Sequence, residues 1–185
     1  MALNRFPVDY AGIRAAMAQG IQLATGLESD KVLQMQAYET AASRPETPFA
    51  AFMLTGIGQP FGRDYRVPGV NGQPTTFQGQ RQLTAQFQFF GETSDDAYGM
   101  ASLWVAGMYH PQVTELMFQL GDLAVWTVSG PTNISQLGAT EYEPRSAVNA
   151  TFGVCSVTYD TLPQVQQVPV AGLVGTRDVP ISDTP

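Results

Sequence analysis

Charged residues are scarce in this 185-residue sequence. Only 14% of its residues are Asp, Glu, Lys or Arg, against about 25% in an average soluble domain. This shortage predicts surface that is not left in water, and burial against other copies of the chain is one explanation. Lysine occurs once, at Lys31, and nine basic residues stand against sixteen acidic ones, for a formal net charge of −7. A nucleic-acid site needs clustered cations. We therefore expect DNA that meets this protein to pass without specific binding.

Cysteine and histidine occur once each, at Cys155 and His110. A lone cysteine excludes an intrachain disulfide and a cysteine metal cluster, and a catalytic triad or a histidine metal site would have to be built around His110 alone. Cys155 lies between apolar positions of a predicted strand, which favours a buried core thiol over a nucleophile. His110 precedes Pro111, a pattern that favours a capping or hinge residue.

Long apolar runs are missing as well. The most apolar window, residues 97–109, is shorter than the roughly 20 residues that span a bilayer. The start MALNRFPVDY lacks a cationic segment followed by an apolar one, and the sequence has no phosphate-binding loop of the G-x-x-x-x-G-K-[ST] type. We expect a soluble protein that does not enter a membrane.

The apolar pattern predicts a single α+β domain over residues 1–160. Helical spacing covers residues 9–26, 97–109 and 112–120, and strand patterns cover residues 31–38, 48–57, 83–89, 123–128 and 146–159. Residues 48–57 form a continuous apolar run, typical of a strand that is covered on both faces. Along residues 83–89 apolar residues alternate with Thr84, Gln86 and Gln88, and the last strand alternates at Val148, Ala150, Phe152 and Val154, which predicts strands with one face in the core and carboxamides on the wet face. We expect a mixed or antiparallel sheet of about five strands with helices packed on one face.

Two segments lack a core-forming pattern. Residues 58–80 hold five glycines and three prolines, which predicts a loop or a long, irregular hairpin, and connections of this length are usually functional. We interpret this segment as a contact arm, with Phe61, Tyr65 and Phe77 as candidate contact residues. Residues 161–185 carry four prolines without helical spacing and predict an extended C-terminal tail.

The helix predicted at residues 97–109 has almost no polar side. In AYGMASLWVAGMY only Ser102 is polar, so apolar side chains surround nearly the whole circumference. One sheet cannot cover all of that surface. We expect its larger side chains to meet another element or a neighbouring subunit, and the candidates are Met100, Leu103, Trp104 and Met108.

Asp95 and Asp96 lie where a predicted strand gives way to this helix. Carboxylates there meet unpaired backbone N–H groups and the positive end of the helix dipole, each worth about 0.3–1 kcal/mol, so we favour a capping role. The alternative from another class is a small metal-dependent enzyme that uses Glu92, Asp95 and Asp96. A third hypothesis is a ligand-binding module built on the aromatic residues of the arm.

Three stretches of the sequence resemble the tail-terminator, or neck-terminator, proteins of long-tailed bacteriophages. They are AQFQFFGE at residues 85–92, the apolar helix DDAYGMASLWVAGM, and EPRSAVNATFGV at residues 143–154, where an acid-x-Arg motif precedes the last strand. The resemblance covers roughly residues 5–160, and its motifs are architectural rather than catalytic.

This resemblance implies a structural virion protein with no enzymatic activity and no cofactor, assembled in the host cytoplasm. It implies a ring, usually sixfold, at the head-proximal end of the tail tube, which stops tube polymerisation, contacts the tail tube protein and the connector, and lets genomic DNA pass through its lumen. A head-tail adaptor or a tube-completion protein stays open as an alternative. Arg145, within the acid-x-Arg motif, is a further candidate for a subunit contact, although a surface ion pair of little energy is slightly favoured.

Overall fold

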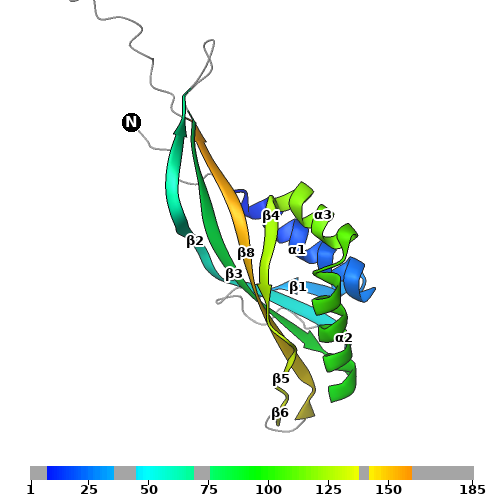
Figure 1. The fold of residues 1–185 in the computed structure, drawn as a ribbon. Helices are drawn as coiled ribbons and strands as arrows, with labels where there is room; N and C mark the ends of the chain where they lie inside the picture. Colours follow the sequence, from blue (N-terminus) through cyan, green and yellow to red (C-terminus); the bar gives the residue numbers. More distant parts are fainter. Residues whose placement is uncertain (1–7, 36–44, 69–75, 138–141, 160–185) are drawn as a thin grey trace, which may run out of the picture.

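The computed structural model describes residues 8–35, 45–68, 76–137 and 142–159, which form an α+β fold. A six-stranded mixed sheet carries helices α1, α2 and α3 on one face (Figure 1). This confirms the fold class and the placement of the helices, with one strand more in the sheet than the five expected. The predicted C-terminal tail, residues 161–185, lies outside the described residues.

Helix α1 (Tyr10–Thr25) begins after Asp9, whose Oδ1 accepts hydrogen bonds from the backbone N–H groups of Ala11 and Gly12, both at 3.0 Å. It ends at Gly26, which has a φ of 76° in the left-handed region that glycine adopts without strain. The side chains that it buries recur every three or four residues: Ile13, Ala16, Met17, Gly20 and Ile21. A 3₁₀ turn, η1 (Ser29–Lys31), then leads into the sheet.

The main sheet has the strand order β1–β2–β3–β8–β4. The bounds are β1 (Val32–Gln34), β2 (Phe49–Val67), β3 (Thr76–Phe90), β8 (Arg145–Tyr159) and β4 (Leu123–Val128). Strand β1 is parallel to β2, and the other pairs are antiparallel. The short β5 (Thr132–Asn133) pairs with the beginning of β8, while β6 (Gln136–Leu137) and β7 (Tyr142–Glu143) form a separate pair.

Strands β2 and β3 continue beyond the helices as a long hairpin, accompanied by the end of β8 (Figure 1). Their ladder runs out to the pair Val67 and Thr76, with register shifts at residues 54–56, 57–59 and 61–65. Gly62 lies in the last of these with a φ of 79°. The described part of the arm is therefore an irregular hairpin. Gly58 and Gly62 lie within two of the register shifts, whereas Pro60 is paired with Arg81 between them.

Helices α2 (Ser94–Gly107) and α3 (Pro111–Gly121) pack with α1 over one face of the sheet. The core beneath them is formed by alternate residues of the two central strands, which are Leu83, Ala85, Phe87 and Phe89 of β3 and Val148, Ala150, Phe152 and Val154 of β8. Each of these is at most 3% exposed. The alternation predicted for both strands is confirmed.

The beginning of β2 is buried on both faces. Ala50 and Phe52 belong to the main core, while Phe49 and Ala51 join Phe90 in a second small cluster on the other face. The rings of Phe49 and Phe90 are stacked, with centroids 4.3 Å apart and an interplanar angle of 8°. The expectation of a strand covered on both faces is confirmed for these first residues of β2.

Candidate contact surfaces

The aromatic residues of the arm are exposed. Phe61 is 57% exposed, Tyr65 55% and Phe77 42%. The Phe61 ring packs against Trp126 of β4, with centroids 4.8 Å apart, and the Tyr65 hydroxyl donates a hydrogen bond to Oε1 of Gln78 at 2.9 Å. These contacts fix the rings on the hairpin without covering them. Sequence analysis missed Trp126, although it occupies an outward position in the alternating run LAVWTV.

An ion pair stiffens the base of the arm. Nη1 and Nη2 of Arg81 donate hydrogen bonds to the two carboxylate oxygens of Asp64, at 2.5 and 2.6 Å, and these hydrogen bonds hold the pKa of Asp64 below its usual value. Gly79 lies buried beneath the pair. Only glycine fits there, because a Cβ would overlap the Asp64 carboxylate. The Ser156 hydroxyl donates to the Gly79 carbonyl at 3.2 Å. The arm is therefore tied to β8 by side chains as well as by its ladder.

Helix α2 turns Trp104 and Met108 into the core, so the expectation that they meet a neighbouring subunit is wrong. Both are 0% exposed, and the indole packs on Phe87 with ring centroids 4.9 Å apart. The physical reason is that helix α1, and not the sheet alone, covers α2. A Cβ added to Gly20 of α1 would lie 3.4 Å from the Trp104 ring, so the two helices approach closely there.

Helix α2 also exposes large apolar side chains. Leu103 is 53% exposed and Tyr98 46%, while Met100 is partly buried against the core. Met100 and Leu103 are three residues apart and share one side of the helix, which we call the outer face of α2. Leu103 and Met100 therefore stay candidates for a contact with another chain. No helix among the described residues has the length and apolarity needed to cross a membrane.

The acidic turn before α2 is a capping box. The Thr93 hydroxyl accepts a hydrogen bond from the Asp96 backbone N–H at 3.1 Å, and Oδ2 of Asp96 accepts one from the Thr93 backbone N–H at 3.0 Å. The capping interpretation is confirmed for Asp96, and Asp95 also lies in the first turn. Within the described ranges, Glu92 and these two residues form no group that could hold a metal ion.

His110 caps the next helix and Cys155 lies on the surface. Nδ1 of His110 accepts a hydrogen bond from the Gln112 backbone N–H at 3.3 Å, which confirms the capping role. Cys155 is exposed, so the prediction of a buried thiol is wrong. Because Val154 points into the core, Cys155 points to the opposite face, where its register partner Gln80 is also exposed.

Arg145 lies partly buried at the start of β8. Its guanidinium carbon is 5.7 Å from the centroid of the Phe90 ring, a cation–π distance, and its backbone N–H donates to the Ser135 hydroxyl at 2.9 Å. Nε of Arg145 is buried and has no hydrogen-bond partner in the described part of the chain. Arg145 is thus anchored on the second apolar cluster, and its role in a subunit contact stays a prediction.

The sheet face opposite the helices is lined by uncharged polar residues. Along β3 these alternate with the core residues, and they are Gln78, Gln80, Gln82, Thr84, Gln86 and Gln88. Their register partners on β8, from Val157 back to Ala147, are also uncharged. We call this surface the carboxamide face. It confirms that the glutamines of this strand point away from the core.

Comparison with known protein families matches residues 10–176 to a family described as phage neck terminator protein. The match includes every helix of the fold, the arm and the whole carboxamide face. No curated protein matches the chain. The family match confirms the resemblance found in the sequence and gives the protein a structural role in the phage tail, in association with tail and neck components. With all but the two ends of its sequence matched, the chain belongs to the phage neck terminator protein family.

Proposed function

We propose that six copies of this chain form a closed ring at the head-proximal end of the tail tube. The ring stops polymerisation of the tube protein and offers a docking face to the connector. Family membership supports this role. A head-tail adaptor or a tube-completion protein is the alternative within the same structural class, and it differs in the neighbours that it touches.

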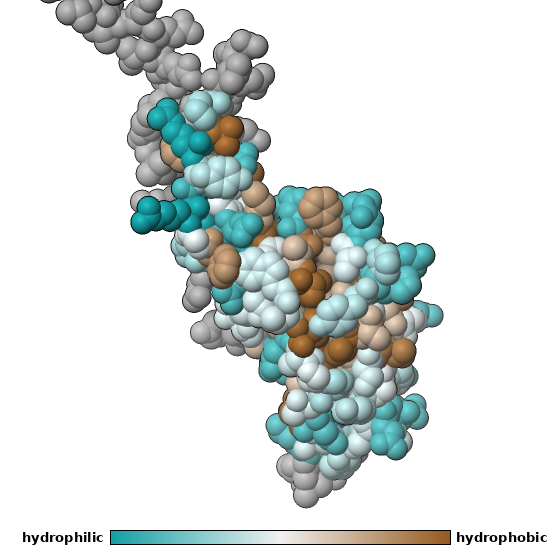
Figure 2. All heavy atoms as spheres, viewed as in Figure 1, coloured by the Kyte–Doolittle hydropathy of each residue, from teal (hydrophilic) through white to brown (hydrophobic). Residues whose placement is uncertain are grey.

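The observation that carries the proposal is that large apolar side chains are exposed in two separate regions. One region is the arm, with Phe61, Tyr65 and Phe77, and the other is the helical layer, with Leu103 and Tyr98 on α2. Figure 2 shows apolar residues gathered across the middle of one side of the molecule, with hydrophilic residues towards its lower end. A closed ring needs one patch that meets a different patch on the next copy. The arm and the helical layer supply two such patches.

The carboxamide face suits the lumen of such a ring. Carboxamide and hydroxyl groups carry no charge, so they do not bind phosphates through the release of counterions. Six copies at −7 each carry a formal charge of −42, which adds a general repulsion of DNA. We place the carboxamide face towards the passing genome and the helices on the outside.

Electron microscopy of the purified protein, alone and mixed with tail tubes, tests the ring. The expected images show a ring with a central hole at one end of each tube. Tube protein that polymerises in the presence of this chain should give shorter tubes. The proposal is wrong if light scattering finds a monomer at every concentration and tube length does not respond. A ring that binds the connector and leaves tube length unchanged supports the adaptor alternative.

A further inference from the structure

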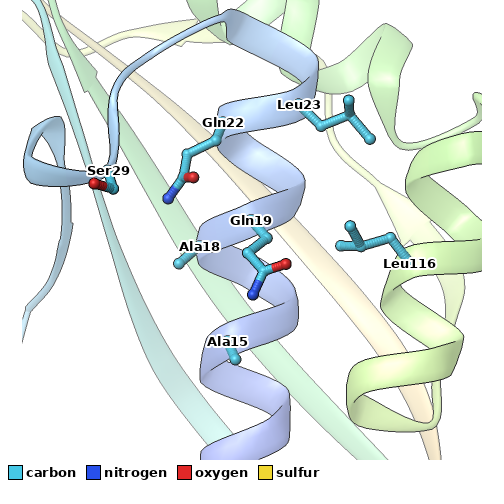
Figure 3. A pocket seen from close by; sticks show the side chains of 7 residues that line it. All are labelled: Ala15, Ala18, Gln19, Gln22, Leu23, Ser29 and Leu116. Atoms are coloured by element: carbon cyan, nitrogen blue, oxygen red, sulfur yellow. The ribbon is translucent and has the colours of Figure 1, made fainter.

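A shallow apolar hollow lies between α1 and α3. Its volume is about 670 Å³, and most of it is open to solvent, so it is a hollow of the surface rather than an enclosed cleft. Figure 3 shows Leu23 of α1 and Leu116 of α3 in the space between the two helices, with Ala15 and Ala18 along α1. Two glutamines and a serine complete the lining, so no lining residue is charged. The hollow therefore fits an apolar side chain.

Acidic residues outnumber basic ones around the rim of this hollow. Glu28 and Asp30 adjoin the lining residue Ser29, Glu115 adjoins Leu116, and Arg14 adjoins Ala15, and all four charged residues are exposed. Lys31 follows in η1, but its ammonium group donates to the carbonyl of Glu46 at 2.8 Å. An occupant that combines an apolar group with a cation would match both the lining and the rim.

The arm carries this combination on a chain that is otherwise acidic. Residues 58–81 hold three arginines and one aspartate, a net charge of +2, which leaves six basic and fifteen acidic residues elsewhere, a net charge of −9. Arg66 and Phe77 are register partners on β2 and β3, so their side chains leave the sheet on the same face. Both are exposed, and Phe77 has no part in the Phe61 contact with Trp126.

We propose that Phe77 of one copy inserts into the α1–α3 hollow of the next copy, where Arg66 meets the acidic rim at Glu28 and Asp30. This inference rests on the proposed ring, because it names the two patches that join neighbouring copies. The contact is heterologous, since hairpin meets helices, and such a contact repeats around a ring. Arginines of the arm could also bind nucleic acid, but phosphates would leave both the apolar lining and the acidic rim without a partner.

Cross-linking between two variants tests the contact. In the Cys155→Ser background, one preparation carries Pro68→Cys, two residues after Arg66 on the arm, and the other carries Gln22→Cys in the lining of the hollow. Mixed full-length proteins treated with a short bis-maleimide should give a cross-linked dimer several times more abundant than Pro68→Cys gives with Thr132→Cys. The control position lies on β5, away from α1 and α3. Equal yields with the two partners, or no cross-link with either, overturn the inference.

Charge reversal then tests the chemistry. Arg66→Glu on the arm variant should reduce the cross-link several-fold, and Glu28→Arg with Asp30→Arg on the hollow variant should restore it. If Arg66→Glu leaves the cross-link unchanged and instead weakens retention on duplex DNA, the partner of the arm is nucleic acid and the inference falls. Images of wild-type rings test the proposed function separately. Rings that persist while the cross-link fails refute only this contact.

Discussion

Replacing Trp104 with alanine separates the core role of α2 from its contact role. The side chain is 0% exposed, and a buried tryptophan hides about 150–250 Å², which at about 25 cal/mol per Å² is worth about 4–6 kcal/mol. The unfolded chain already hides part of that area, so we expect Trp104→Ala to lower the free energy of unfolding by about 4 kcal/mol. Nε1 of Trp104 has no hydrogen-bond partner in the described residues, so the substitution breaks no such bond there.

The matched variant is Leu103→Asp, one residue earlier on the same helix. Leu103 is 53% exposed, so this change should cost less than about 1 kcal/mol of stability. If the outer face of α2 contacts another chain, the buried carboxylate should weaken assembly strongly. Urea unfolding followed by circular dichroism measures the first effect, and light scattering together with binding to tail tubes measures the second.

Each of the two variants is expected to lose a property that the other keeps. Trp104→Ala should lose stability and keep its contact surface, and Leu103→Asp should stay folded and lose its contacts. A Trp104→Ala protein as stable as the wild type would refute the assignment of this indole to the core. A Leu103→Asp protein that assembles normally would remove the outer face of α2 from the contact surfaces.

Two further predictions concern local geometry. Thr93→Ala should lower stability by about 1 kcal/mol through loss of the capping box, and Thr93→Ser should retain most of it. A loss of the same size from both variants in urea unfolding would argue against the capping hydrogen bonds. Gly153→Ala should destabilise the sheet by about 1–3 kcal/mol, because its Cβ would overlap the Trp126 indole. Gly130, with no neighbour within 4 Å of an added Cβ, is the matched control, and equal thermal shifts for the two alanine variants would contradict the overlap.

Local signals in the sequence were sufficient to predict most of the helices and strands. Asp9 and Gly26 bound the first helix because a side-chain oxygen and a left-handed residue satisfy its free backbone groups. Alternation along β3 and β8 gave the core face, since successive side chains of a strand point to opposite sides. The acid-x-Arg motif and the apolar helix led to the family, which the comparison confirms.

The errors arose where a local pattern leaves the direction of a side chain open. Helix α2 is apolar on nearly all sides, so its sequence does not say which side faces the core, and Trp104 and Met108 were assigned to the wrong one. Their burial depends on α1, which is far away in the sequence. For Cys155 the alternation was correct, but burial on the second face of a strand depends on a covering layer. Among the described elements, no helix covers that face at the arm.

The α1–α3 hollow could not be predicted from the sequence. Its lining combines Leu23 and Ser29 with Leu116, and only the packing of the two helices brings these residues together. The carboxamide face was partly foreseen, because glutamines alternate with apolar residues along one strand. Its extent over β8 required the register of the two strands, which pairs Gln80 with Cys155 and Gln86 with Asn149.

The free edge of β2 is irregular along most of its length. Strand β1 covers this edge only opposite Ala50–Phe52, so the described remainder of β2 pairs on one side alone. A long, regular edge of this kind recruits strands from other molecules and leads to fibrils. The register shifts, together with Pro60 and the charged Arg63 and Asp64, interrupt the row of backbone donors and acceptors. This edge of β2 is therefore protected against the strand-to-strand association that leads to fibrils.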